Sequence, residues 1–264
     1  MSNPWDAPDQ PARDPALWRI SGNALVLLAV WVASGVALAA MEDPPGVVTF
    51  VFVFAGWIAS VAVHEFCHAF VAFKGGDTTV RDKGYLTFNP LAYGHAATSL
   101  IIPLIILALG GIGFPGGAVY LRNDLIRNAQ WRSAAALAGP GGTLLVLLFL
   151  ASVMSVLRLT GISSGELAPG IAMLGFLQAT ALMLNLLPLP GLDGYGALEP
   201  FLPLSVRRMM IPVARVGVYL LLAIVLIAPG VTQQLFDAAF QLTNALGISP
   251  ALVSVGIDEF RFWR

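Results

Sequence analysis

Residues 47–73 of the chain read VVTFVFVFAGWIASVAVHEFCHAFVAF. This stretch is apolar almost throughout, and Glu65 is the only charged residue between Asp43 and Lys74. About 20 apolar residues are enough for an α-helix to cross the roughly 30 Å hydrocarbon layer of a bilayer. The stretch therefore predicts a transmembrane helix. An ionisable side chain inside such a helix is costly and usually marks a functional site.

The composition of the whole chain points the same way. Of its 264 residues, 57% are hydrophobic and 11% are charged, whereas about 25% are charged in an ordinary soluble domain. This composition excludes a soluble globular enzyme and a disordered chain. The net charge of −1 offers no basic surface for nucleic acid, and a single cysteine excludes an internal disulfide framework. We therefore expect an integral protein of the lipid bilayer.

Long charge-poor segments along the chain are candidate membrane spans. The segment at 96–121 has seven Pro and Gly residues between positions 103 and 117, an unusual density of helix breakers. We expect this segment to re-enter the membrane, which leaves five crossings; a sixth full crossing is the alternative. The six segments are Ser21–Met41, Val47–Phe73, Ala96–Leu121, Ser133–Leu157, Leu167–Leu192 and Met209–Ala228.

Lysine and arginine concentrate in cytoplasmic loops, so their positions predict the orientation. Arg13 and Arg19 precede the first segment, whereas the turn at 42–46 contains neither residue type. This pattern places the N-terminus in the cytoplasm of a multi-pass protein of the cell membrane. We expect residues 1–20 to form a cytoplasmic tail and residues 21–230 to form one membrane domain.

The C-terminal residues 231–264 carry an apolar pattern at helical spacing. It is consistent with an amphipathic helix on the outer surface and equally with an ordinary packing helix. The expected fold is therefore all-α and polytopic, with five to six transmembrane helices.

The motif H-E-F-C-H places His64, Glu65 and His68 inside the second apolar segment. Residues i and i+4 share one face of a helix, so two imidazoles converge on one metal ion, and Glu65 beside them is placed to take a proton from water. The alternative is a hydrogen-bonded polar patch that packs helices. Cys67 lies off the histidine face, and we interpret it as an apolar filler.

A third metal ligand is expected from elsewhere, because zinc in hydrolases usually has three protein ligands and one open position. Residues 185–194 read NLLPLPGLDG, and Asp193 is the only charged residue between Glu166 and Glu199. The prolines break the helix just before Asp193. Asp193 is our candidate ligand; the alternative is that it caps the next helix.

At this point the chain resembles the site-2 protease family of intramembrane zinc metalloproteases, in its compact branch without a PDZ domain. The resemblance covers residues 47–198 and depends on H-E-F-C-H, on N-x-x-P-x-P-x-L-D-G, on F-N-P after the first motif, and on G-P-G-G-T at 139–143. It implies His64, His68 and Asp193 as zinc ligands, Glu65 as general base and Asn185 as a substrate-binding residue. The implied activity is hydrolysis of peptide bonds within transmembrane segments of protein substrates.

Two positions depart from the family pattern. Residues 89–97 read NPLAYGHAA where relatives often have N-P-L-x-H-x-D-P, which leaves the role of His95 open. Thr143 stands where the family has Asn in G-P-x-x-N. Neither departure touches the implied ligands.

The loop after the first motif predicts a short β-hairpin, with strands at Asp77–Val80 and Tyr85–Phe88 around a turn. Such a hairpin could pair with an unwound substrate strand. The glycine-containing segment 96–121 is a candidate gate or clamp.

Three other functions are compatible with parts of the pattern. A protease of the prenyl-protein-processing type would take its third ligand from a downstream glutamate, Glu166 or Glu199. A zinc transporter would need polar residues on several spans, and few are present. A proteolytically inactive relative that only binds membrane proteins would keep the same motifs. The substrate and the oligomeric state are not specified by the sequence.

Overall fold

The computed structural model describes residues 20–93, 119–161 and 164–263, and every regular element in these ranges is helical. This confirms the all-α expectation. The segment around His95 and most of the predicted re-entrant segment lie outside the described residues. The helices are α1 (Gly22–Ala40), α2 (Gly46–Gly75), α3 (Thr79–Asp82), α5 (Ala129–Thr160), α6 (Leu167–Asn185), α7 (Asp193–Leu198), a 3-10 turn η2 (Glu199–Phe201), α8 (Leu204–Ile227), α9 (Pro229–Ala245) and α10 (Pro250–Phe260).

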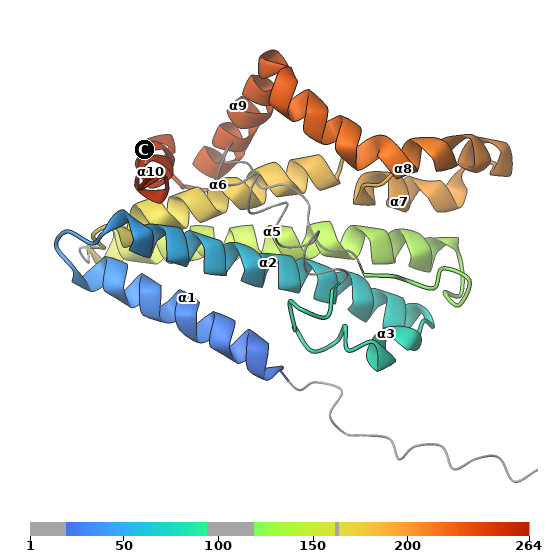
Figure 1. The fold of residues 1–264 in the computed structure, drawn as a ribbon, viewed down its shortest axis with the longest axis horizontal. Helices are drawn as coiled ribbons and strands as arrows, with labels where there is room; N and C mark the ends of the chain where they lie inside the picture. Colours follow the sequence, from blue (N-terminus) through green and yellow to red (C-terminus); the bar gives the residue numbers. More distant parts are fainter. Residues whose placement is uncertain (1–19, 94–118, 162–163, 264) are drawn as a thin grey trace, which may run out of the picture.

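Four of these helices, α1, α2, α5 and α6, are long and apolar enough to cross a membrane, and the bent pair α9 and α10 passes the same test as one unit. The four lie roughly side by side (Figure 1). The sixth apolar segment forms α8, but several of its side chains lie outside the described residues, so its crossing stays a prediction.

Helix α6 is the centre of the fold, and α2 and α5 pack against it. In its most apolar window 83% of α6 is buried, whereas the value for α1 is 17%. Small residues allow the close approach, as is usual between membrane helices. A Cβ at Gly56 of α2 would lie only 2.7 Å from the indole nitrogen of Trp31 on α1. Because most of α1 is not buried by other helices, its apolar outer face is available to contact lipid.

The C-terminal residues fold back on the core. Phe176 of α6 packs against Phe236 and Phe240 of α9. Phe260 of α10 is fully buried and stacks on Phe50 of α2, with ring centroids 5.1 Å apart. These contacts cover one side of α6 with α9 and α10 (Figure 1).

The predicted β-hairpin was wrong. Within residues 77–88 the structure has no strand, and Thr79–Asp82 form the single helical turn α3. The cause is local: Oδ1 of Asp77 accepts hydrogen bonds from the backbone N–H of Thr79 at 3.1 Å and from its hydroxyl at 2.6 Å. Such side-chain bonds to nearby backbone favour a turn over an extended strand.

Candidate metal centre and active site

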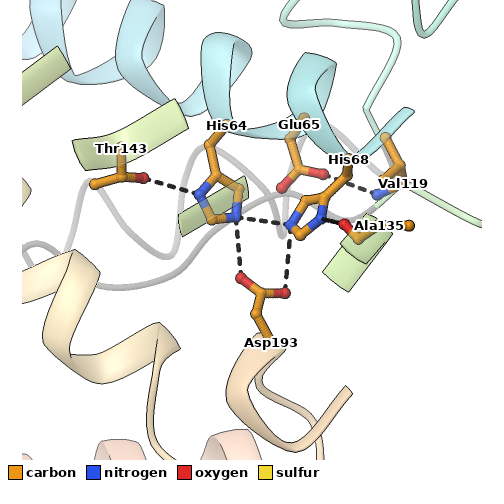
Figure 2. A network of polar contacts seen from close by, with 7 residues as sticks. All are labelled: His64, Glu65, His68, Val119, Ala135, Thr143 and Asp193. Atoms are coloured by element: carbon orange, nitrogen blue, oxygen red, sulfur yellow. Dashed lines mark hydrogen bonds and ion pairs between the residues drawn. The ribbon is translucent and has the colours of Figure 1, made fainter. Parts of the chain in front are cut away.

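Two histidines and one aspartate meet at the centre of the molecule. His64 and His68 lie one turn apart on α2, and their Nε2 atoms are 3.0 Å from each other. Asp193, the first residue of α7, places Oδ2 3.2 Å from Nε2 of His64 and Oδ1 3.3 Å from Nε2 of His68 (Figure 2). One ligand atom from each residue lies within 4.8 Å of the others, so the group could hold a metal ion.

Helix α5 orients both imidazoles. Nδ1 of His68 donates to the backbone carbonyl of Ala135 at 2.7 Å, and Nδ1 of His64 lies 2.9 Å from the hydroxyl of Thr143 (Figure 2). Because a carbonyl only accepts, Nδ1 of His68 carries a proton, and Nε2 of the neutral ring presents a lone pair to the centre. Metal-binding histidines typically have such a partner on their other nitrogen.

A glycine on α5 provides the space between the two rings. A Cβ at Gly139 would lie 2.6 Å from Nε2 of His64 and closer still to Nε2 of His68. Real Cβ atoms do not come this close to other heavy atoms, so a side chain at 139 would collide with both imidazole nitrogens. Any side chain at 139 would therefore displace the two candidate ligand rings.

The donor set fits zinc. A tetrahedral zinc ion with bonds of about 2.0–2.1 Å separates its ligand atoms by about 3.3 Å, and the three spacings here are 3.0, 3.2 and 3.3 Å. Oδ2 of Asp193 is buried and has no hydrogen bond of acceptable geometry in the part of the chain that the structure describes. Lone pairs that face one another in a buried space repel unless a cation lies between them.

The chain between α6 and α7 carries Asp193 to the centre. Pro188 and Pro190 prevent α6 from continuing, and Gly191 turns the backbone with φ +103°. Gly194 then packs against the end of α6, where a Cβ would meet the Leu187 carbonyl oxygen at 2.6 Å. Burial raises the pKa of the Asp193 carboxyl, but the adjacent imidazoles outweigh burial and hold this pKa well below its usual range. Asp193 is therefore an anionic group at neutral pH.

Glu65 follows His64 on α2 and is 3% exposed. Its Oε2 accepts a hydrogen bond from the backbone N–H of Val119 at 3.0 Å. Two further bonds hold the segment that begins at Val119: the Arg122 N–H donates to Oδ2 of Asp77 at 2.7 Å, and Lys83 Nζ donates to the Tyr120 carbonyl at 2.7 Å. This segment therefore orients the candidate base.

The metal centre opens into a cavity of about 500 Å³. Asn185, the last residue of α6, lines it and is 6% exposed. Glu199 also lines the cavity but does not belong to the group of potential metal ligands, and Glu166 is not among the lining residues. Among the described residues, Asp193 and neither glutamate lies together with the two histidines.

The structure brings together His64, Glu65, His68 and Asp193 and places Asn185 at the same cavity, as the sequence predicts. Sequence reasoning missed the supporting contacts of Ala135 and Val119. Both are made by backbone groups, which leave no mark on residue identity. The motif G-P-G-G-T did contain a signal, since a Cβ at its first glycine would meet both imidazoles and the hydroxyl of its threonine lies next to His64.

Comparison with known proteins identifies relatives that are named as zinc metalloproteases. "Putative zinc metalloprotease Rip2" of Mycolicibacterium smegmatis is 43% identical over 250 residues, which cover 90% of this chain and 92% of the relative. The protein of the same name from Mycobacterium tuberculosis is 42% identical over 214 residues, or 81% of each chain. "Putative zinc metalloprotease YwhC" of Bacillus subtilis is 30% identical over 159 residues, which cover 58% of this chain and 70% of the relative.

No protein-family model and no solved structure matches the chain. The extent of the match to the curated relatives, together with apolar helices around a buried His–His–Asp group, is nevertheless sufficient to assign it. The chain belongs to the site-2 protease family of membrane zinc metalloproteases.

Proposed function

We propose that this protein is an intramembrane zinc endopeptidase that hydrolyses peptide bonds within transmembrane segments of other proteins. The observation that carries the proposal is the depth of the site. His64 lies 18 residues after the start of α2 at Gly46 and 11 residues before its end at Gly75, so the metal-binding group is far from both ends of a 30-residue apolar helix. A peptide bond that reaches this site comes from inside the membrane.

In this proposal His64, His68 and Asp193 hold the zinc ion. When bound, zinc supplies a Lewis acid that activates water and polarises a carbonyl group. Glu65 acts as the general base: its carboxylate takes a proton from the attacking water and later gives a proton to the leaving amine. The Val119 N–H fixes one oxygen of this carboxylate. The α5 contacts of both histidines keep their Nε2 atoms directed at the ion.

Asn185 is proposed to bind the substrate. Its side chain is buried and lines the cavity at the end of α6. An amide N–H so placed can donate to the scissile carbonyl as negative charge develops on its oxygen, which is an effective form of catalysis in a site with little water.

The environment of the site fits this substrate class. The polar side chains of the cavity provide a place for the water that hydrolysis consumes, and the apolar outer surfaces of α1 and α5 face lipid, through which a helical substrate diffuses. We infer a position in the cell membrane with the N-terminus in the cytoplasm, on the basis of Arg13, Arg19 and the later basic loops.

The main experiment compares wild type with Glu65→Gln in proteoliposomes that contain a single-span model substrate. The variant keeps the size of the side chain and removes its basicity, so we expect cleavage to fall roughly 10²–10⁴-fold while the zinc content stays the same. Equal cleavage by both proteins, or wild-type cleavage that a chelator leaves unchanged, would refute the proposal. Substrate that binds without being cut would support the inactive binding protein instead.

A second experiment tests the third ligand. Purified Asp193→Ala should lose most of its zinc by elemental analysis, and Glu199→Gln, a change at the same cavity, should keep it. The opposite result would assign the third position to Glu199, as in proteases of the prenyl-protein-processing type.

A further inference from the structure

One of the polar groups that line the cavity outside the metal centre is a buried amide of α6. Gln178 of α6 is 1% exposed and lines the cavity. Its Nε2 atom is buried and lacks a hydrogen-bond partner within the described ranges. An unpaired amide in a low-dielectric interior is destabilising, because its donors lose the bonds they make with water. Such a nitrogen is available to donate to a bound ligand.

Gln178 and Asn185 both come from α6 and line the same cavity. Gln178 precedes Asn185 by seven residues, so both side chains project from nearly the same face, about 10.5 Å apart along the helix axis. Apolar residues also line the cavity, among them Trp57 and Val61 on α2 and Ala181 on α6. The hydroxyl of Ser60, another lining residue, donates within its own helix, to the Gly56 carbonyl at 2.7 Å. Two lining residues of the cavity, Gln178 and Arg132, thus have a buried side-chain nitrogen without a hydrogen-bond partner among the described residues, and Gln178 is the uncharged one.

The spacing fits an unwound peptide. An extended chain rises about 3.4 Å per residue, so 10.5 Å corresponds to about three residues. In an extended chain the N–H and C=O of one residue point to the same side, and a primary amide offers one acceptor and two donors that can pair with both. The pairing works with either orientation of the amide and with any substrate sequence.

We propose that Gln178 is a substrate-binding residue that pairs with the backbone of the unwound substrate about three residues from the scissile bond. This inference depends on the proposed function, because it assumes that the substrate is a peptide. It adds a second backbone-binding position to that of Asn185, and together the two amides would keep a stretch of the transmembrane segment out of its helical conformation.

The first test uses Gln178→Leu, with Gln234→Leu as a matched control on the exposed surface of α9. Removing an unpaired buried amide should leave the zinc content unchanged and the thermal stability equal or higher. We expect KM for the model substrate to rise roughly tenfold, the effect of losing one to two neutral hydrogen bonds, with kcat within about twofold. The control should match wild type. An unchanged KM would overturn the inference.

The second test does not require cleavage, so it separates this inference from the proposed function. In a Cys67→Ala, Glu65→Gln background, cysteine is placed at position 178 or at position 185, and the model substrate carries single cysteines scanned along its span. Disulfides are formed with copper phenanthroline and mapped by mass spectrometry.

The two mapping profiles measure the conformation of the bound segment. We expect the substrate positions of strongest cross-linking from 178 and from 185 to differ by about three residues. A difference of about seven residues would mean that the substrate stays helical along α6, and the absence of cross-links from 178 would mean that it does not reach this position. Either outcome overturns the inference, whereas a failure of wild type to cleave would refute only the proposed function.

Discussion

Helices α2 and α6 pack side by side in the core, and both contribute polar side chains to the same cavity. Two pairs of these side chains differ in their surroundings: His64 and His68 on α2, and Gln178 and Asn185 on α6. Each imidazole on α2 has a second partner on α5, the hydroxyl of Thr143 or the carbonyl of Ala135. On α6, Nε2 of Gln178 has no hydrogen-bond partner among the described residues, and the buried Asn185 lines the same cavity. The two imidazoles on α2 are thus held by second contacts, whereas the amide of Gln178 on α6 is available to a bound substrate.

The difference follows from what each pair has to bind. A metal ion requires ligand atoms fixed to within a few tenths of an ångström, and second contacts provide this precision. A peptide backbone brings its own donors and acceptors, so groups that bind it must be free of other partners. The comparison therefore predicts that damage to the α2 pair removes the ion, whereas damage to the α6 pair spares the ion and impairs substrate binding or turnover.

The strongest way to break this distinction is to fill the space between the histidines. Gly139→Ala puts a methyl group within 2.6 Å of Nε2 of His64, and we expect loss of bound zinc and of all measurable cleavage. The matched control is Gly141→Ala on the same helix, where an added Cβ meets nothing within 4 Å. It should retain zinc and activity. Zinc is measured by elemental analysis; normal zinc in Gly139→Ala would show that the ion lies elsewhere.

Asn185→Leu addresses the other side of the comparison. It removes one donor near the scissile carbonyl while leaving the three ligands and their α5 contacts intact. We expect kcat to fall roughly 10²-fold, a loss typical of a single oxyanion donor, with zinc content equal to that of wild type. Single-turnover cleavage and elemental analysis of the same preparation check both parts. Loss of zinc here would mean that α6 also supports the metal centre.

The metal-binding residues of the site could be predicted from the sequence. The shared face of His64 and His68 is a property of one helix, so spacing alone predicts it. The isolation of Asp193 among apolar residues identified a candidate that the fold then brings to the histidines from 125 residues away. In both cases the residue type itself carries the chemistry, and a charge in an apolar segment is rare enough to be noticed.

The parts that could not be predicted depend on tertiary packing or on backbone groups. The carbonyl of Ala135 and the N–H of Val119 exist at almost any residue, so only the packing of α5 and of the 119–122 segment on α2 selects them. The hairpin prediction failed because a polar alternating pattern does not reveal that Asp77 bonds to Thr79. The sequence marked Gln178 only as one of the few polar residues in the later apolar segments and assigned it no role, since its burial and its unpaired Nε2 are known only from the structure.

Thr143→Val sharpens the comparison by removing one second contact and nothing else. Valine has nearly the same shape but cannot bond to Nδ1 of His64, and loss of such a partner typically weakens metal binding about 10–100-fold. Competition with a zinc chelator measures the affinity. Thr143→Ser keeps the hydroxyl and should bind zinc like wild type. If valine binds as tightly as threonine, the hydroxyl does not orient His64.

Cys67→Ala should have the smallest effect, although Cys67 immediately precedes the ligand His68. Its Sγ points to α5, 2.8 Å from where a Cβ of Gly142 would lie, so the thiol packs between helices and does not face the ion. We expect zinc content and cleavage to match wild type, with about 1 kcal/mol or less lost in stability because one buried atom is removed. Adjacency in sequence then counts for less than the face of the helix on which a side chain lies. Reduced zinc binding in this variant would contradict that view and make Cys67 part of the metal centre.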